Sequence, residues 1–452
     1  MPSTRIAELA AQIQENTAKV DQYLQRKDLP SPSFHQDGPV DLKIEDEQVQ
    51  EAREIALDSS LELHQLLLGP ALCLRPVVII HSLSLSLSPL PFYPTAGLLL
   101  MRSFASALLQ LNGVSLQAIY KYDIASNVPI HGEISFSRLA SKCGMSETNL
   151  RRIVRFAIAY HRVFQEARKG YVSHSAASRK LAEDANARAG LGYMFDEVWQ
   201  AFARTVEARE RFRSDEPNQS GWSLSHHTDK PMWEYYASHP DMAERFAGSM
   251  STFSNGLGLS PSFLTKSYPW SSIGDNGRGT VVDVGGSRGN VSIALAQTHH
   301  NLKLIVQDLP DMIRGAKEAV PSDVTGRVDF MEHDFFTPQP VKADLYLFRN
   351  IFHNWSDTHV VKILRATIPA LEPGARVVAN DYLIPEPKTM SPSKEREIRG
   401  MDMIMLSLFN ARERDYSDWE QIFTEADSRF THITIWIPEG ATLAIIEAVW
   451  AG

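Results

Sequence analysis

The chain has 452 residues, of which 43% are hydrophobic and 22% charged, so it can bury a sizeable core and divide into two or three structural units. Its net charge of −9 provides no overall positive field for a polyanion, which argues against nucleic acid as a partner. Its two cysteines, Cys73 and Cys143, lie too far apart in sequence for a disulfide framework or a thiolate metal site, and they favour a reducing, cytoplasmic location.

Residues 1–69 are expected to form helices that pack on another part of the molecule. Apolar residues recur at helical spacing over 3–26, a proline-containing linker follows at 29–33, and a second helical region covers 46–68. The N-terminus carries charges throughout, unlike the apolar core of a signal peptide, so we expect no export signal.

Residues 70–97 form an atypical segment whose composition matches neither flank. Arg75 and Arg102 bound a stretch without charged side chains that is nominally long enough to cross a bilayer. Its prolines and alternating serines would leave broken helical hydrogen bonds and polar groups in hydrocarbon, so we expect no membrane span. We interpret the segment as an insertion or a translated intron, and we expect a poorly packed excursion at the surface.

Residues 98–184 are expected to form a winged-helix domain. The expected elements are, in order, a strand at 133–136, a helix at 137–142, a turn at Gly144, a helix at 146–160, and a hairpin of 163–164 with 171–172. Arg151, Arg152 and Arg155 on the second helix would suit a DNA-binding regulator, which is the remote alternative to an enzyme. The acidic total charge argues against that alternative.

Residues 185–268 predict a helical connector with aromatic-rich turns, which we expect to contribute to a substrate pocket. From residue 269 onward, strands alternate with helices, the pattern of a doubly wound, mostly parallel sheet in an α/β domain. The expected strands are 281–284, 302–306, 328–331, 345–348, 376–379 and 444–448.

A glycine-rich turn after the first of these strands predicts a ligand that carries a nucleoside. Gly285, Gly286 and Gly289 let the backbone approach a ligand, and the helix that follows offers unpaired N–H groups. Asp308 ends the next strand, where a carboxylate can accept both hydroxyls of a ribose. The alternative is a tight turn beside a solvated aspartate.

Asp283 favours a cationic ligand at this turn. The glycine spacing is not the dinucleotide fingerprint, and a carboxylate on the strand would repel a pyrophosphate. S-adenosylmethionine carries an ammonium and a sulfonium, so it fits better. Asp334 could accept from the adenine amino group while Phe335 covers the ring, and the alternative is a capping aspartate beside a core phenylalanine.

His353 follows the fourth strand, at the edge where open α/β sheets bind their ligands. A histidine beside Phe352 and Trp355 is, without this context, more often structural. Methionine and aromatic side chains suit a flat substrate ring, although each is more often a core residue. The pocket candidates are Trp199, Met250, Phe253, Met401, Met405, Phe409 and Asn410.

Together these motifs resemble the plant-type, metal-independent O-methyltransferases of the caffeic-acid type, and most closely their fungal polyketide-tailoring branch, the sterigmatocystin 8-O-methyltransferase group. The resemblance covers nearly the whole chain except the 70–97 segment. Its motifs are Asp283-Val284-Gly285-Gly286 with Gly289, Gln307-Asp308-Leu309-Pro310, His353-Asn354-Trp355-Ser356-Asp357, Pro373-Gly374, and Ala411-Arg412-Glu413-Arg414.

The resemblance implies a Rossmann-like domain that binds S-adenosylmethionine, and a homodimer formed through the N-terminal domain. It implies a phenolic hydroxyl of an aromatic, polyketide-derived metabolite as acceptor, and no metal. His353 would be the general base, flanked and oriented by Asp381 and Glu413. Leu309 and Arg349 would contact the cofactor, and Trp355 the substrate.

Three residues depart from the family pattern. Asn354 stands where aspartate is frequent, Asp381 where glutamate is frequent, and Ser287 where glycine is common. A shorter carboxylate puts the role of Asp381 in doubt. Transfer to nitrogen or carbon, and a non-catalytic protein that only binds S-adenosylmethionine, remain as alternatives.

Overall fold

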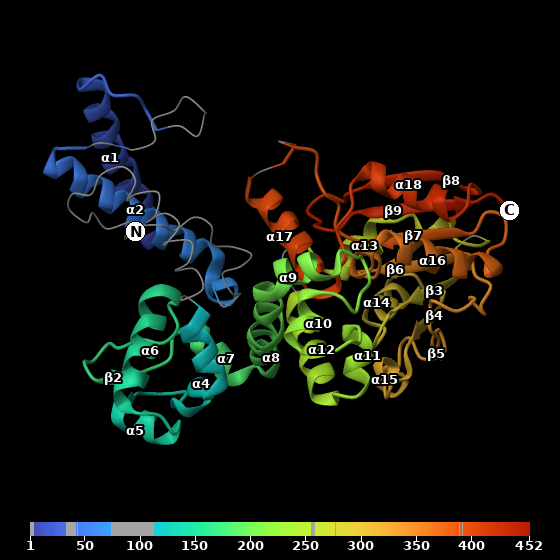
Figure 1. Ribbon diagram of the computed structural model, residues 1–452, viewed down its shortest axis with the longest axis horizontal. Coiled ribbons are helices and arrows are strands. Elements are labelled where there is room, and N and C mark those ends of the chain that lie inside the picture. Colours follow the sequence, from blue (N-terminus) through green and yellow to red (C-terminus); the bar gives the residue numbers. More distant parts are fainter. Residues whose placement is uncertain are drawn as a thin grey trace. The chain divides into compact units, whose positions relative to one another are not determined.

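The computed structural model describes residues 4–32, 42, 44–73, 113–254, 258–275, 277–387, 389–390 and 392–452. The chain divides into two compact units, residues 1–185 and 186–452 (Figure 1). No helix within the described ranges is long and apolar enough to cross a membrane. Most of the 70–97 segment lies outside these ranges, so its interpretation as an insertion stays a prediction.

Helices dominate the described part of the N-terminal unit. Its elements are α1 (Arg5–Arg26), α2 (Glu47–Cys73), α4 (Ile124–Asn127), β1 (Ile134–Ser135), α5 (Phe136–Lys142), α6 (Glu147–His161), β2 (Tyr171–Val172) and α7 (Ala176–Glu183). The apolar spacing of α1 buries Leu9, Tyr23 and Leu24. α1 packs on α2, and α2 also contacts α7, so these helices do find the packing partner that their sequence requires.

The elements from β1 to β2 follow the expected order, with a correction at the hairpin. Gly144 takes φ of +63° in the turn between α5 and α6. β2 pairs with β1 and not with residues 163–164, where only an isolated bridge joins Gln165 to Ser173. The reason is that Phe164 has φ of +72°, which no strand residue adopts, and its side chain is buried as a core residue.

The first part of the C-terminal unit is helical. Its helices are α8 (Ala185–Tyr193), the π-helix η1 (Met194–Val198), α9 (Trp199–Phe212), α10 (Gly221–Ser225), α11 (Met232–Ala237), α12 (Pro240–Ser254), α13 (Pro261–Ser267) and the 3-10 turn η2 (Trp270–Ser272). α10 packs closely on α9, because a Cβ at Gly221 would lie only 2.5 Å from the carbonyl oxygen of Ala201.

A seven-stranded sheet forms the rest of this unit (Figure 1). Its strands are β3 (Thr280–Val284), β4 (Lys303–Asp308), β5 (Val328–Glu332), β6 (Leu345–Arg349), β7 (Arg376–Asn380), β8 (Phe430–Trp436) and β9 (Ile445–Trp450), in the order β5-β4-β3-β6-β7-β9-β8. β3 to β7 are parallel, and β9 is antiparallel to both of its neighbours. The expected fold class is confirmed, and the six expected strands are present.

β8 is a correction, because we expected no strand at 430–436. It lies at the edge of the sheet and pairs only with β9. A shift in register between Thr431 and Thr434 interrupts the pairing, and His432 has φ of +50°. This irregularity and the partly exposed side chains obscure the alternation that marks a strand.

Helices cover both faces of the sheet. The remaining helical elements are α14 (Asn290–Thr298), α15 (Pro310–Ile313), η3 (Lys317–Ala319), η4 (Phe352–Asn354), α16 (Asp357–Thr367), η5 (Ile368–Ala370), α17 (Pro392–Phe409) and α18 (Tyr416–Ala426). Tyr346 and Phe348 of β6 pack in one core with α16 and α18, whereas Leu345 and Leu347 pack in the other with α13 and α14. The strand order reverses between β3 and β6. In open α/β sheets, the ligand-binding crevice lies at the carboxyl ends of the strands beside such a reversal.

Candidate active site

The turn after β3 has glycine where a side chain would not fit. Gly285 has φ of +74°, its N–H donates to the carbonyl of Gln307 at 2.7 Å, and a Cβ there would overlap Ile351. A Cβ at Gly286 would lie 2.6 Å from the Asp283 carboxyl carbon, and one at Gly289 would lie 2.9 Å from the ring of Phe330. The bare backbone of this turn is therefore required by packing as well as available to a ligand.

Two carboxylates lie at the carboxyl ends of β3 and β4. Asp283 is 2% exposed and accepts the Ser292 hydroxyl at 2.7 Å, and burial raises its pKa to about 6. Asp308 accepts the N–H groups of Ser287 at 2.8 Å and Leu309 at 2.7 Å, and burial also raises its pKa. Each group therefore favours a ligand that brings positive charge or hydrogen-bond donors.

The backbone conformation of Ser287 is one that favours glycine, the residue that is common at this position. Its φ is +50°, in the left-handed region that costs a side chain about 1–2 kcal/mol. The hydrogen bond from its N–H to Asp308 holds it there.

Phe335 lies beside the glycine turn, within 3.9 Å of a Cβ built on Gly285. Its ring meets that of Trp355 edge-on at 5.9 Å. Asp334 is exposed and uses one carboxylate oxygen to accept the N–H of Phe336 at 3.0 Å, so it acts as a turn-forming aspartate in this structure. A contact of Asp334 with adenine stays a prediction.

Arg349 ends β6 and interacts electrostatically with the buried carboxylates of Asp283 and Asp381. Its guanidinium donates to the Asn380 side chain and to the carbonyl of Leu259 at 2.5 Å. Burial lowers its pKa, while the charges of Asp283 and Asp381 oppose that shift. The arginine therefore places a positive charge in the acidic crevice.

His353 lies in η4, directly after β6, and is 7% exposed. Its Nδ1 is 2.8 Å from a carboxylate oxygen of Glu413, and its ring stacks on Tyr382 with centroids 6.3 Å apart. Burial alone would lower the pKa of His353, but the charge and hydrogen bond of Glu413 and the charge of Asp381 outweigh it, so the pKa is raised. The imidazole is thus a stronger base than a free one.

Asp381 follows β7 and is completely buried. Within the described part of the chain, neither of its carboxylate oxygens has a hydrogen-bond partner, and the same holds for Glu413 Oε2 and Asn350 Oδ1. Burial raises the pKa of Asp381, and the charges of His353 and Arg414 and the nearby N–H groups of Phe352 and His353 counteract this without reaching hydrogen-bond geometry. Glu413 therefore contacts the imidazole, and Asp381 acts on it through space.

Asn354 contributes to the shape of the turn that carries His353. Its side-chain amide donates to the carbonyl of Asn350 at 2.9 Å, which an aspartate could not do. Asn350 itself has φ of +53°. The departure from the family pattern at 354 thus has a structural explanation.

The predicted pocket residues occupy different environments. Met405 and Phe409 are buried on α17, and Phe409 stacks on Trp233 with ring centroids 5.4 Å apart. The half-buried Met401 packs against the apolar cluster that contains Tyr382. Trp355 is 8% exposed and belongs to the sheet core. Trp199 and Met250 are half-buried, and the side chain of Phe253 lies outside the described structure.

Asn410 has a structural role at the end of α17. Its side-chain oxygen accepts from Arg209 at 2.8 Å, and its amide donates to the carbonyls of Ser214 at 2.7 Å and Glu216 at 3.1 Å. With φ of +57°, it ends the helix and ties it to the loop after α9. A substrate contact from this side chain would have to compete with all three bonds.

Tyr382 and Arg414 were not predicted as parts of the site. Arg414 is buried and binds backbone carbonyls on both sides of His353. The available signal was its position next to Glu413 in the sequence, whereas nothing in the sequence distinguished Tyr382 from a core aromatic.

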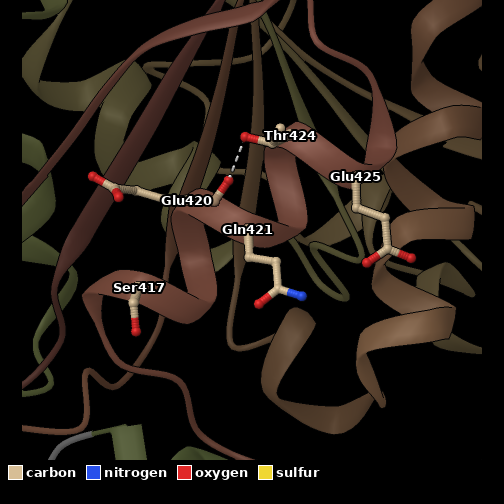
Figure 2. Close-up of a pocket in the computed structure, with 5 residues that line it drawn as sticks. All are labelled: Ser417, Glu420, Gln421, Thr424 and Glu425. Atoms are coloured by element: carbon tan, nitrogen blue, oxygen red, sulfur yellow. Dashed lines mark hydrogen bonds between the residues drawn. The ribbon is translucent and has the colours of Figure 1, made fainter.

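Two further features do not contribute to this site. Among the described residues, no group of three or more His, Cys, Asp or Glu side chains could hold a metal ion. A depression on α18 is lined by Ser417, Glu420, Gln421, Thr424 and Glu425 (Figure 2). The Thr424 hydroxyl there donates to the carbonyl of Glu420 at 2.8 Å, as in many exposed helices, and this surface carries no part of the crevice.

Comparison with known proteins identifies the family. Residues 214–429 match the model of the O-methyltransferase domain. A grayanic acid biosynthesis cluster O-methyltransferase of Cladonia grayi is 50% identical over 99% of this chain and 88% of its own length. A chlorophenol O-methyltransferase of Trichoderma longibrachiatum is 34% identical over 99% of this chain and 90% of its own length.

The crystal structure of OxaC in complex with SAH and oxaline has the same fold. It covers 98% of this chain and 100% of its own, with a TM-score of 0.67 and 20% identity. The sequence relatives and the shared fold confirm the resemblance that the motifs indicated. The chain therefore belongs to the O-methyltransferase family and is an S-adenosylmethionine-dependent O-methyltransferase.

Proposed function

We propose that the protein methylates a phenolic hydroxyl of an aromatic, polyketide-derived metabolite, with His353 as the general base. The observation that supports this most directly is the buried His353–Glu413 pair, 2.8 Å apart, at the carboxyl end of β6. A phenolic acceptor agrees with the name of the Trichoderma relative, a chlorophenol O-methyltransferase.

The residues of the glycine turn fit S-adenosylmethionine. The ammonium of the cofactor would lie against Asp283, which is buried and accepts the Ser292 hydroxyl. Asp308 would accept the ribose hydroxyls beside Leu309. The ring of Phe335 and the carboxylate of Asp334, which follow β5, would bound the adenine. When bound, the cofactor supplies an electrophilic methyl group on its sulfonium.

The geometry of β3 and β6 would bring the donor and the base together. Gly285, Gly286 and Gly289 form the bare side of the crevice, and Arg349 and His353 follow the neighbouring strand. Arg349 would balance the charges of the two carboxylates beside the cofactor. In-line placement of acceptor oxygen and methyl group supplies much of the rate, since both partners are then held in one orientation.

The pKa difference between a phenol and an imidazole determines how strong a base His353 has to be. A phenol with a pKa of about 10 and an imidazole of about 6.5 differ by roughly 3.5 units, so full transfer before attack would cost about 5 kcal/mol. The raised pKa of His353 narrows this gap, because Glu413 stabilises the imidazolium. Asp381 would add to the same effect through its charge. We therefore place the proton on the Nε2 side of the ring, opposite the Nδ1 held by Glu413.

The acceptor pocket and the dimer belong to the same proposal. Residues 185–268 would form one wall of the pocket and α17 the other, with residues 269–452 as the cofactor-binding domain. The N-terminal unit would form a homodimer through helices α1 and α2 together with the 98–184 region. Most large apolar side chains that are exposed in the described chain lie on this unit, including Leu67 at 67%.

The test is transfer from methyl-labelled S-adenosylmethionine to anthraquinone, xanthone and simpler phenol acceptors. We expect label on the phenolic oxygen, and none on the matching methyl ethers. Transfer to the corresponding anilines instead, or to no acceptor while the cofactor still binds, would refute the phenolic assignment.

A further inference from the structure

Arg414 forms hydrogen bonds to the short turn, η4, that carries His353. Its guanidinium donates to the carbonyl of Phe352 at 2.9 Å and to the carbonyl of Trp355 at 2.7 Å, which bracket η4. Nε donates to a carboxylate oxygen of Asp357 at 3.0 Å. The Arg414 side chain is completely buried, so its bonds to the two carbonyls are shielded from water and fix the turn at both ends.

The same short segment of chain holds the imidazole from a second direction. Glu413 precedes Arg414 and binds Nδ1 of His353. The backbone of Arg414 is itself anchored, because its carbonyl accepts the N–H of Ile384 at 2.8 Å and a bridge pairs it with Leu383. Consecutive residues thus fix the ring and the backbone of the histidine at once.

We propose that Arg414 is a positioning residue for His353, and that Asp357 is the countercharge that holds the guanidinium in place. This rests on the proposed function, in which His353 is the base. Arg414 touches neither ring nor carboxylate of the His353–Glu413 pair by a hydrogen bond, so it acts through the backbone of η4. Arg412 also forms an ion pair with Asp357, at 2.7 Å, but its side chain is 44% exposed and donates to no carbonyl of the turn. Of these two arginines, only Arg414 therefore holds η4.

Charge adds a second, separable effect. Glu413 and Asp381 face His353 and raise its pKa, whereas the positive charge of Arg414 lowers it, and the Tyr382 ring covers one side. Arg414→Lys keeps the charge and loses the fork of hydrogen bonds. Arg414→Met loses both, so only this variant should also move the acid limb of the pH profile to higher pH.

Arg365 offers a matched control. It likewise donates to two backbone carbonyls, of Ala426 at 3.2 Å and Glu425 at 2.8 Å, and it joins α16 to the end of α18 away from His353. Arg365→Lys therefore makes the same chemical change in the same unit without touching η4.

The experiment compares an un-ionised phenol with a polyhalogenated phenol that is already ionised at the assay pH. Because the ionised acceptor needs no base, Arg414→Lys should lower kcat by about 10- to 100-fold on the first and less than about threefold on the second. Arg365→Lys should be close to the parent on both. Affinity for S-adenosylmethionine, measured by calorimetry, should change less than about twofold.

Two further variants separate the possible failures. His353→Ala should lose the un-ionised phenol selectively, and if it does not, the proposed function fails. If His353→Ala behaves as expected while Arg414→Lys matches Arg365→Lys, or loses both phenols equally, the positioning role is overturned. Asp357→Asn retains a hydrogen-bond acceptor and should fold, so it tests the same selectivity, at about three- to tenfold, should the Arg414 variants prove unstable.

Discussion

At the scale of single residues, the pair formed by His353 and Glu413 decides when the imidazole can accept a proton. Burial lowers the pKa of His353, because it disfavours the charged ring, whereas Glu413 and Asp381 raise it. The two carboxylates together outweigh burial, so the pKa is raised. The glutamate therefore controls both the strength of the base and the pH at which it becomes available.

Glu413→Gln should lower the pKa of His353, because burial continues to disfavour the charged ring after the carboxylate is gone. The acid limb of kcat/KM should move to lower pH, and the plateau should fall by about 10- to 100-fold because the base is weaker. A pH-rate profile with an un-ionised phenol measures both. An unchanged limb would contradict the assigned role of Glu413.

The same variant should affect stability in one pH range. The folded pKa of His353 is raised, so the stability from its pair with Glu413 is fully present below the unfolded value of about 6.5 and is lost as pH rises through the folded pKa. Glu413→Gln should therefore lower Tm more at pH 5.5 than at pH 8.5. Equal losses at both would show that packing, and not charge, dominates.

Asp283 should make cofactor affinity depend on pH. Its pKa of about 6 means that the carboxylate takes up a proton below that pH and no longer attracts an ammonium. The Kd for S-adenosylmethionine should then rise by up to about tenfold for each pH unit below 6. Calorimetry from pH 5 to 8 measures this, and Asp283→Asn should give weak binding with a flatter profile.

At the scale of elements, the turn between β3 and α14 combines two requirements in one glycine. Gly285 needs a positive φ, and it also lies against Ile351 of the segment after β6. The first requirement is common to many turns, whereas the second links the cofactor turn to the segment that leads to His353.

Gly285→Ala should therefore cost more than strain alone. We expect about 1–2 kcal/mol from the left-handed backbone plus about 1–3 kcal/mol from the overlap with Ile351, and weaker cofactor binding. Gly315 is the matched control, because it has φ of +70° and open space around a built Cβ. Chemical denaturation of both variants isolates the overlap, and equal losses would refute it.

The sequence predicted the elements whose pattern is local and missed those set by packing. Glycine, aspartate and histidine at the ends of strands indicated where the site lies, because the carboxyl ends of parallel strands share one edge of the sheet. β8 was missed because its bulge hides the alternation, and the hairpin was misplaced because the φ of Phe164 is not encoded in propensity. The roles of Tyr382 and Arg414 depend on tertiary contacts that no spacing reveals.

At the scale of the whole molecule, the described part of the N-terminal unit exposes more large apolar side chains than that of the C-terminal unit. In the described chain, Ile6, Ile55, Leu66 and Leu67 of α1 and α2 are each more than a third exposed, which suits a covering partner. A second copy of the chain is the partner that the family resemblance implies.

Leu67→Glu should shift the dimer toward monomer, because it places a charge on the most exposed of these side chains. Val206→Glu is the control, since Val206 on α9 of the other unit is 72% exposed. Sedimentation analysis over a range of concentrations should show at least about a tenfold weaker dimer for the first variant alone. A monomeric parent protein would end the proposal.

The position of β9 in the sheet affects the order in which the C-terminal unit can fold during synthesis. β9 is inserted between β7 and β8, although it is the last of the seven strands along the chain. During synthesis β7 and β8 therefore lack their common neighbour until β9 has emerged from the ribosome, so this side of the sheet closes last. Until then, one edge of β7 and the whole of β8 present unpaired backbone groups that other chains could pair with.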